Sequence, residues 1–457
     1  MKYFLNLLIM TISLNAFADD NKVKEFVLEN GLKVIVKEDH RSPIVVSQVW
    51  YKIGSSYEES GKTGLSHLLE HLMFKGTAQY AAGQFSKIMA ENGADENAFT
   101  STDYTAYFQK LEKNRLAISF KLESDRMRGL KFDQKEFDKE REVVIEERKL
   151  RTDDKPNALM YEIFKATAYQ TSPYRNPIIG WMPDLKMVTL EDAKNWYQRW
   201  YAPNNAIVVV AGDVNSEEVF NLAKEYFGHL KPFEITPIKS TQEIPQFGIK
   251  RITVKKPAKL PYFLMGYKVP SIKTTEESWI PYALQLVSYI LDGGESSRFT
   301  RHLIRGKEIA TSVNTSYDPY GRLEELFVFS GTPTQSNTIQ TLETAVREQI
   351  KVLQTELVKE DELKRIKAQL VAAKIYEKDS VFYQAMQIGQ LESIGLPNRL
   401  ADEFVTNISA ITPEQIQTVA QKYFVDETLT VAVLEPQPLS QATASKESIS
   451  TSNGHGH

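Results

Sequence analysis

The chain of 457 residues contains no cysteine, which excludes disulfide bonds, thiol-based catalysis and lipid attachment at an N-terminal cysteine. Its stability must come from apolar burial, for which its length is sufficient. A basic excess is also missing, since the formal net charge is -4. Nothing in the composition therefore favours a nucleic acid or an anionic membrane surface as a partner.

Long apolar runs are scarce as well, and the one at the N-terminus is too short for a stop-transfer helix. A single lysine precedes this run, and Ala16, Phe17 and Ala18 follow it. This order of features is typical of a secretory signal peptide with an A-x-A cleavage site. We expect residues 1–18 to be removed, and the mature protein to be periplasmic or secreted, without a membrane span.

One pattern near the middle of the chain returns near its end. Each copy has Thr-x-Glu, a helical pattern, an aromatic pair, a short polar turn and an alternating apolar strand. Thr189 matches Thr412, Trp200 matches Tyr423, and the members of both pairs lie 223 residues apart. A constant offset through several features predicts a duplicated domain.

The stretch over residues 229–250 carries three prolines and no helical apolar period, which predicts a linker between the two halves. The predicted organisation is an N-terminal domain over 22–230, a linker over 231–247, a homologous C-terminal domain over 248–436 and a disordered tail over 437–457. Strands and helices alternate without a regular βαβ order. We therefore expect an α+β fold, in which each half is an antiparallel-rich sheet with helices packed on one face.

The stretch TGLSHLLEHLMFKGT, residues 63–77, holds two of the seven histidines. His67 and His71 are four residues apart, so both would lie on one face of a helix, and Glu70 would flank that face. Two imidazoles can hold a zinc ion, and a carboxylate beside them can reach a water bound to it. The alternative is a pair of helix histidines that make local hydrogen bonds.

A catalytic zinc site needs a third protein ligand. The charged helical pattern over residues 137–150 offers candidates, because Glu140 and Glu147 are seven residues apart and share a face. Glu146 lies about a quarter-turn away, and the spacing alone does not choose between Glu146 and Glu147. For most charges in this stretch, a solvated helix with ion pairs is the better interpretation.

H-x-x-E-H is the inverzincin order of the zinc motif. The wider sequence resembles the pitrilysin/insulinase family of zinc metallopeptidases, most closely its short-chain branch, which includes the mitochondrial processing peptidases. The stretches that carry the resemblance cover nearly all of the mature chain: GSSYEESGKTGLSHLLEHLMFKGT, ENGADENAFTSTDYTAYF, ESDRM, EREVVIEE, YAPNNAIVVVAGDV and LDGGESSRF.

The resemblance implies two similar α+β halves that close around a chamber, with one zinc ion per chain. The family's third ligand lies about 76 residues after the second histidine, which favours Glu147. The implied ligands are thus His67, His71 and Glu147, with Glu70 as general base. A supporting glutamate seven residues before the third ligand matches Glu140, which would orient a ligand.

For substrate binding, the resemblance implies that Asn97, Ala98 and Phe99 offer a strand edge to an extended peptide. Active relatives complete the site with an arginine and a tyrosine from the second half or from a partner chain. Arg305 fits the arginine, but Thr311 stands where the tyrosine is expected.

Tyr317 lies six residues further on, in a register that looks wrong. We therefore expect this chain to be the catalytic subunit of a two-chain peptidase. It would form a homodimer or a heterodimer with a related chain that supplies the arginine and the tyrosine. The alternative is a non-catalytic scaffold or binding subunit of the same family.

Overall fold

The computed structural model describes residues 23–236 and 241–439. The predicted signal peptide and all but the first three residues of the predicted tail lie outside the described residues. Two β-sheets organise the chain, one formed by strands from residues 23 to 212 and the other by strands from residues 250 to 437. Among the described helices, none is long and apolar enough to cross a membrane.

The N-terminal sheet has six strands in the order β1-β2-β6-β3-β5-β4. Their bounds are β1 (Val23–Val27), β2 (Lys33–Glu38), β3 (Ile44–Tyr51), β4 (Asp95–Thr100), β5 (Thr105–Glu112) and β6 (Ala206–Gly212). Only the pair of β2 and β6 is parallel. Strand β4 is an edge of this sheet, so it has one row of backbone groups free to pair with another chain.

The C-terminal sheet has five strands in the order β7-β11-β8-β10-β9. Their bounds are β7 (Lys250–Pro257), β8 (Tyr262–Val269), β9 (Ala310–Ser316), β10 (Glu325–Pro333) and β11 (Leu429–Gln437). Again only the first pair, β7 and β11, is parallel. This order and these directions repeat those of β2-β6-β3-β5-β4, so the predicted α+β fold with two similar halves is confirmed.

The repeated helix before the last strand of each half has the same cap. Thr189 precedes α7 (Leu190–Trp200) and Thr412 precedes α14 (Pro413–Tyr423), and each threonine forms a capping box with the residue three positions later. Such reciprocal hydrogen bonds satisfy backbone donors at a helix start. The shared sequence pattern therefore encodes the same helix entry in both halves.

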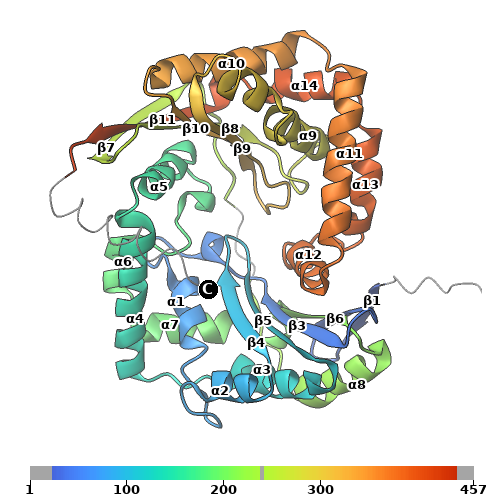
Figure 1. Cartoon of the computed structure of the whole chain (residues 1–457). Helices are drawn as coiled ribbons and strands as arrows, with labels where there is room; N and C mark the ends of the chain where they lie inside the picture. Colours follow the sequence, from blue (N-terminus) through green and yellow to red (C-terminus); the bar gives the residue numbers. More distant parts are fainter. Residues whose placement is uncertain (1–22, 237–240, 440–457) are drawn as a thin grey trace, which may run out of the picture.

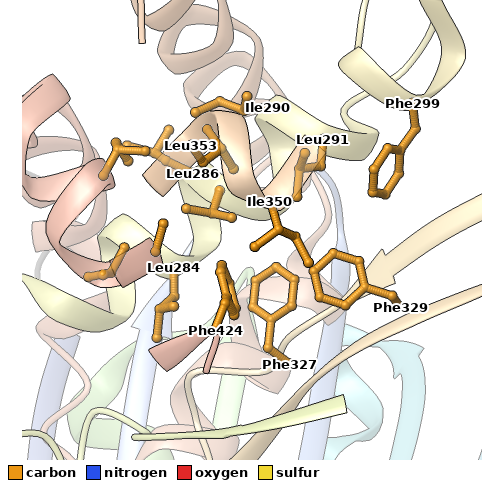
Figure 2. Close-up of a cluster of buried hydrophobic side chains, with 14 of the residues drawn as sticks. Leu284, Leu286, Ile290, Leu291, Phe299, Phe327, Phe329, Ile350, Leu353 and Phe424 are labelled. Carbon is orange, nitrogen blue, oxygen red and sulfur yellow. The ribbon is translucent and has the colours of Figure 1, made fainter. Parts of the chain in front are cut away.

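Helices cover the outer face of each sheet (Figure 1). The remaining helices are α1 (Leu65–Leu72), α2 (Gln84–Glu91), α3 (Leu116–Gly129), α4 (Gln134–Arg148), α5 (Pro156–Ala168), α6 (Met182–Met187), α8 (Ser216–Phe227), α9 (Ile280–Asp292), α10 (Ile339–Thr355), α11 (Glu360–Glu377), α12 (Val381–Ser393) and α13 (Leu400–Ala410). Figure 2 shows the C-terminal core, where Leu284 and Ile290 of α9 pack near Phe327 of β10 and Phe424.

The other face of each sheet receives one helix from the opposite half, which the sequence did not indicate. Helix α5 packs on β11, β7 and β8, and α12 packs on β6 and β3. Figure 1 shows the two sheets facing each other, with α5 and α12 at opposite ends of the space between them. This exchange joins the halves around an interior in which both sheets present an apolar surface.

Each of these two helices contacts the opposite sheet at a point where one of the two elements has a glycine. A Cβ atom on Gly266 of β8 would lie 2.6 Å from Cζ of Phe164 on α5. A Cβ atom on Gly389 of α12 would lie 2.0 Å from Cε2 of Trp50 on β3. Since real Cβ contacts are longer than this, each aromatic ring occupies the space that any larger residue would fill.

Candidate metal centre

Helix α1 presents the two histidines of the H-x-x-E-H motif. Its N-terminus follows Gly64, which has φ +85°. The backbone N–H groups of Gly64 and Ser66 donate hydrogen bonds of 2.7 Å to the carboxylate of Glu58. This carboxylate satisfies donors that a helix start otherwise leaves open. The buried leucines of α1 pack into the N-terminal core, so the histidines face the other way.

Helix α4 packs against α1 and brings a third ligand to the histidines. Oε2 of Glu147 lies 3.4 Å from Nε2 of His71 and 3.8 Å from Nε2 of His67. The three donor atoms lie within 4.8 Å of one another. Glu146, the alternative that spacing left open, is exposed and pairs with Lys149 at 2.6 Å instead.

This donor set fits zinc. Ligand atoms about 2.1 Å from a tetrahedral zinc ion lie roughly 3.4 Å from one another, close to the two distances from Glu147 and shorter than the 4.8 Å within which the whole set lies. Burial, the neighbouring His71 and Arg151 lower the pKa of His67 to about 3, so this imidazole is neutral, as a metal ligand must be. Two imidazoles and one carboxylate leave a fourth position open, the arrangement of catalytic zinc sites.

Glu140 lies behind the histidines and is buried. Its Oε2 is 3.4 Å from Nδ1 of His71, and its Oε1 is 2.8 Å from Nζ of Lys75. A carboxylate that accepts a hydrogen bond from Nδ1 fixes the tautomer in which Nε2 is free to bind a metal. Glu140 lies close enough to His71 for this contact, and its role in orienting a ligand stays a prediction.

Glu70 projects from the same helix into the site. The hydroxyl of Thr100, the last residue of β4, donates a hydrogen bond of 2.5 Å to its Oε2. Burial raises the pKa of Glu70 to about 7, an effect that Thr100 opposes and Glu147 increases. A carboxyl with a pKa near neutrality can both accept and return a proton.

A cleft of about 480 Å³ opens from these residues. His67, Glu70 and Glu147 line it, together with Ala98, Phe99 and Thr100 of β4 and with Ala158, Tyr161 and Lys165 of α5. Asn97 lies one residue before this group on the same edge strand and is exposed. The strand edge predicted to bind peptide thus borders the candidate metal ligands.

The residues predicted from the second half lie elsewhere. Arg305 follows a short helix, Thr300–Ile304, is exposed, and pairs with Glu295. The hydroxyl of Thr311 donates to the carbonyl of Thr332 on the neighbouring strand. The hydroxyl of Tyr317 donates to the carbonyl of Pro270 at 2.6 Å. None of these three side chains lines the cleft.

Several residues at the site were missed from the sequence, among them Thr100, Arg151, Tyr161 and Lys165. Nη1 of Arg151 pairs with Oε1 of Glu147 at 2.6 Å. Its position four residues after Glu147 is a helical ion-pair spacing, so a signal for this contact was present. The other three reach the site through tertiary packing, for which a single sequence gives no signal.

Two family models match the chain: "Insulinase (Peptidase family M16)" over residues 33–181 and "Peptidase M16 inactive domain" over residues 187–370. Zinc protease PqqE of Helicobacter pylori is 34% identical over 434 residues, which cover 91% of this chain and 93% of that protein. The beta subunit of mitochondrial-processing peptidase from Dictyostelium discoideum is 24% identical over 91% of this chain and 89% of its own length.

Among solved structures, the crystal structure of a protease from Helicobacter pylori is similar, with a TM-score of 0.86 and 32% sequence identity. The match covers 91% of this chain and 100% of that one. The chain belongs to the insulinase family of peptidases, family M16, which includes named zinc proteases.

Proposed function

We propose that this chain is a zinc-dependent endopeptidase that cleaves extended peptides or small unfolded polypeptides. One observation carries the proposal: the donor atoms of His67, His71 and Glu147 converge, with Glu70 beside them, in a cleft bordered by the edge strand β4. A bound zinc ion at such a site supplies Lewis-acid activation of a water for attack on a peptide carbonyl.

The proton transfers fall to Glu70. Thr100 holds Oε2 of this carboxylate, so Oε1 takes the proton from the attacking water. The same carboxyl then returns the proton to the nitrogen of the leaving amine. Glu140 keeps a proton on Nδ1 of His71, so that Nε2 remains a metal donor.

The substrate would pair with the free edge of β4. An extended peptide added as a strand beside Asn97, Ala98 and Phe99 gains backbone hydrogen bonds that depend little on its sequence. Such pairing carries the peptide past Thr100 to Glu70. An endopeptidase of broad sequence tolerance follows from this arrangement.

Chelation tests the metal requirement. Purified protein stripped with a chelator should cleave a library of fluorogenic peptides at background rate, and one equivalent of zinc should restore cleavage. A stripped protein that retains its full rate would contradict the proposal. If the fully zinc-loaded protein cleaves none of the peptides, either alone or with a related chain, the result would favour the alternative that the chain is a non-catalytic subunit.

We also propose that a related chain completes the site with an arginine and a tyrosine. The support is that Thr311 and Tyr317 hydrogen-bond within the C-terminal half and that Arg305 pairs with Glu295. Within the part of the chain that the structure describes, Tyr161 is the one tyrosine that lines the cleft.

The purified chain tests this second proposal. We expect low turnover for the chain by itself and a large gain when a related chain is co-expressed. Full activity as a monomer would contradict the proposal. A loss of that activity in Tyr161→Phe would then assign the tyrosine role to Tyr161. The signal-peptide pattern of this chain supports a site of action in the periplasm or outside the cell.

A further inference from the structure

The cleft wall beyond the metal ligands is cationic. Arg151, Lys165 and Arg175 all line the cleft. Lys165 lies on the face of α5 that also carries Tyr161, one turn earlier. The adjoining face of α5, with Met160 and Phe164, packs on the C-terminal sheet. Because that packing holds the helix in place, Lys165 is held toward the cleft.

Within the described residues, Lys165 has acidic neighbours but no direct partner for its side chain. No hydrogen bond or ion pair joins its ammonium group to any residue between 23–236 or 241–439. Burial lowers the pKa of Lys165, and the negative charges of the neighbouring Glu325 and of Asp103 oppose that effect. A half-buried ammonium group that makes no direct hydrogen bond or ion pair gains from a carboxylate that enters the cleft.

The acidic residues of the cleft are already engaged. Glu162 forms a bidentate pair with Arg148, with distances of 2.8 and 2.7 Å. Glu147 faces the histidines and Arg151, and Glu70 is the proposed base. The cleft therefore holds two cations, Lys165 and Arg175, that no carboxylate of the cleft pairs with.

We propose that this cleft selects peptides with a carboxylate close to the cleaved bond and that Lys165 binds it. The carboxylate belongs to an aspartate or glutamate side chain or to the free C-terminus of a short peptide. This inference rests on the proposed peptidase function and adds a substrate class to it. A charge-assisted hydrogen bond in a partly desolvated cleft contributes about 1.5–3 kcal/mol, which corresponds to roughly tenfold or more in affinity.

A matched peptide series tests the proposal. One glutamate is moved along a neutral fluorogenic decapeptide, position by position, with glutamine as the neutral counterpart. Each peptide is made with a free and with an amidated C-terminus, and mass spectrometry locates the cleaved bond. The readout is the ratio of kcat/KM for glutamate to that for glutamine within each zinc-loaded protein, so overall losses of activity cancel.

The wild type should favour glutamate about tenfold at one position near the cleaved bond, or the free C-terminus over the amide. The ratio should fall to near one in Lys165→Met and below one in Lys165→Glu. Lys224→Met, which removes the same charge from the exposed face of α8, should keep the wild-type ratio. Equal rates for every glutamate and glutamine pair and for acid and amide, or an unchanged ratio in Lys165→Met, would overturn the inference.

A binding measurement separates this inference from the proposed function. If the zinc-loaded wild type cleaves no peptide, the peptidase proposal fails, and fluorescence anisotropy of the same peptides with Glu70→Gln decides the carboxylate preference. Preferential binding of the acidic peptides would then support the inference by itself. Equal binding of acidic and neutral peptides would overturn it.

Discussion

The hydroxyl of Thr100 donates a hydrogen bond of 2.5 Å to Oε2 of Glu70. Thr100 ends the edge strand β4, and Glu70 lies between the two histidines on α1. The contact therefore joins the strand proposed to hold substrate with the carboxylate proposed to move protons. It fixes one oxygen of Glu70 and leaves the other for the water.

Removing the hydroxyl of Thr100 should leave the side chain of Glu70 less well positioned, while zinc binding should not change. We expect Thr100→Val to lower kcat about tenfold, because a misplaced general base loses part of its usual contribution of 10²–10⁴. Zinc content, measured by atomic absorption, should stay at one per chain. Thr100→Ser keeps a hydroxyl and should recover most of the rate. Equal rates for the valine and serine variants would contradict this role.

The two acidic residues of α4 near the histidines should affect zinc affinity to different degrees. Glu147→Gln removes a proposed ligand and should weaken zinc binding most. Glu140→Gln removes the partner of His71 and should weaken it 10–100-fold, the usual effect of an outer-shell partner. Glu146→Gln is the matched control, because Glu146 is exposed and pairs with Lys149.

Competition with a fluorescent zinc chelator measures all three affinities. The expected order of loss is Glu147→Gln, then Glu140→Gln, then no change for Glu146→Gln. A loss in Glu146→Gln as large as that in Glu147→Gln would mean that the third ligand has been assigned to the wrong glutamate.

The close contact between Phe164 of α5 and Gly266 of β8 should contribute to the stability of the packing between the two halves. Gly266→Ala places a methyl group 2.6 Å from the ring and should destabilise the fold by about 1–3 kcal/mol, the usual cost of overpacking. Calorimetry should show a lower Tm. Phe164→Leu combined with Gly266→Ala should lose less than the sum of the two single losses. Additive losses would show that the two residues do not share this space.

Glu243 lies in the segment between the halves and forms hydrogen bonds with both the N-terminal and the C-terminal half. Its carboxylate accepts hydrogen bonds from Lys268 and from the backbone N–H groups of residues 170–172. Burial alone would raise the pKa of Glu243, but these donors lower it to about 2. Because this value lies below the ordinary 4.5, ionised Glu243 stabilises the fold above pH 4.5, and that stabilisation is lost as pH falls toward 2.

The Tm of Glu243→Gln should therefore lie below that of the wild type at pH 7, and the gap should narrow from pH 4.5 downward. Glu234→Gln is the control, because Glu234 is exposed in the same segment. Its Tm should follow that of the wild type at every pH. A gap that stays constant from pH 7 to pH 3 would contradict the role of the charge.

The parts of the site that the sequence predicted are local. His67, Glu70 and His71 share one helix, so their spacing alone places them on one side. Glu147 needed the family spacing, because the distance between two helices depends on how they pack. The structure separates Glu147 from Glu146 through the rotation of α4, which turns one glutamate toward α1 and the other toward solvent.

The contributions of α5 and α12 could not be predicted in this way. The apolar pattern of α5 shows that one face is buried, but not that it is buried on the sheet of the other half. Tyr161 and Lys165 reach the cleft only because of that packing. The position of Thr311 follows from the register of β9, and Tyr317, the residue after that strand, packs on Phe327 and not toward the candidate metal ligands.

The central claim is that Glu70 performs proton transfer at a zinc site formed by His67, His71 and Glu147. The most direct test is the kcat of Glu70→Gln, measured at the same zinc content as the wild type and in the same assembly. We predict that zinc remains at one per chain while kcat falls by at least about 10²-fold. An unchanged kcat in a variant with full zinc content would contradict the account.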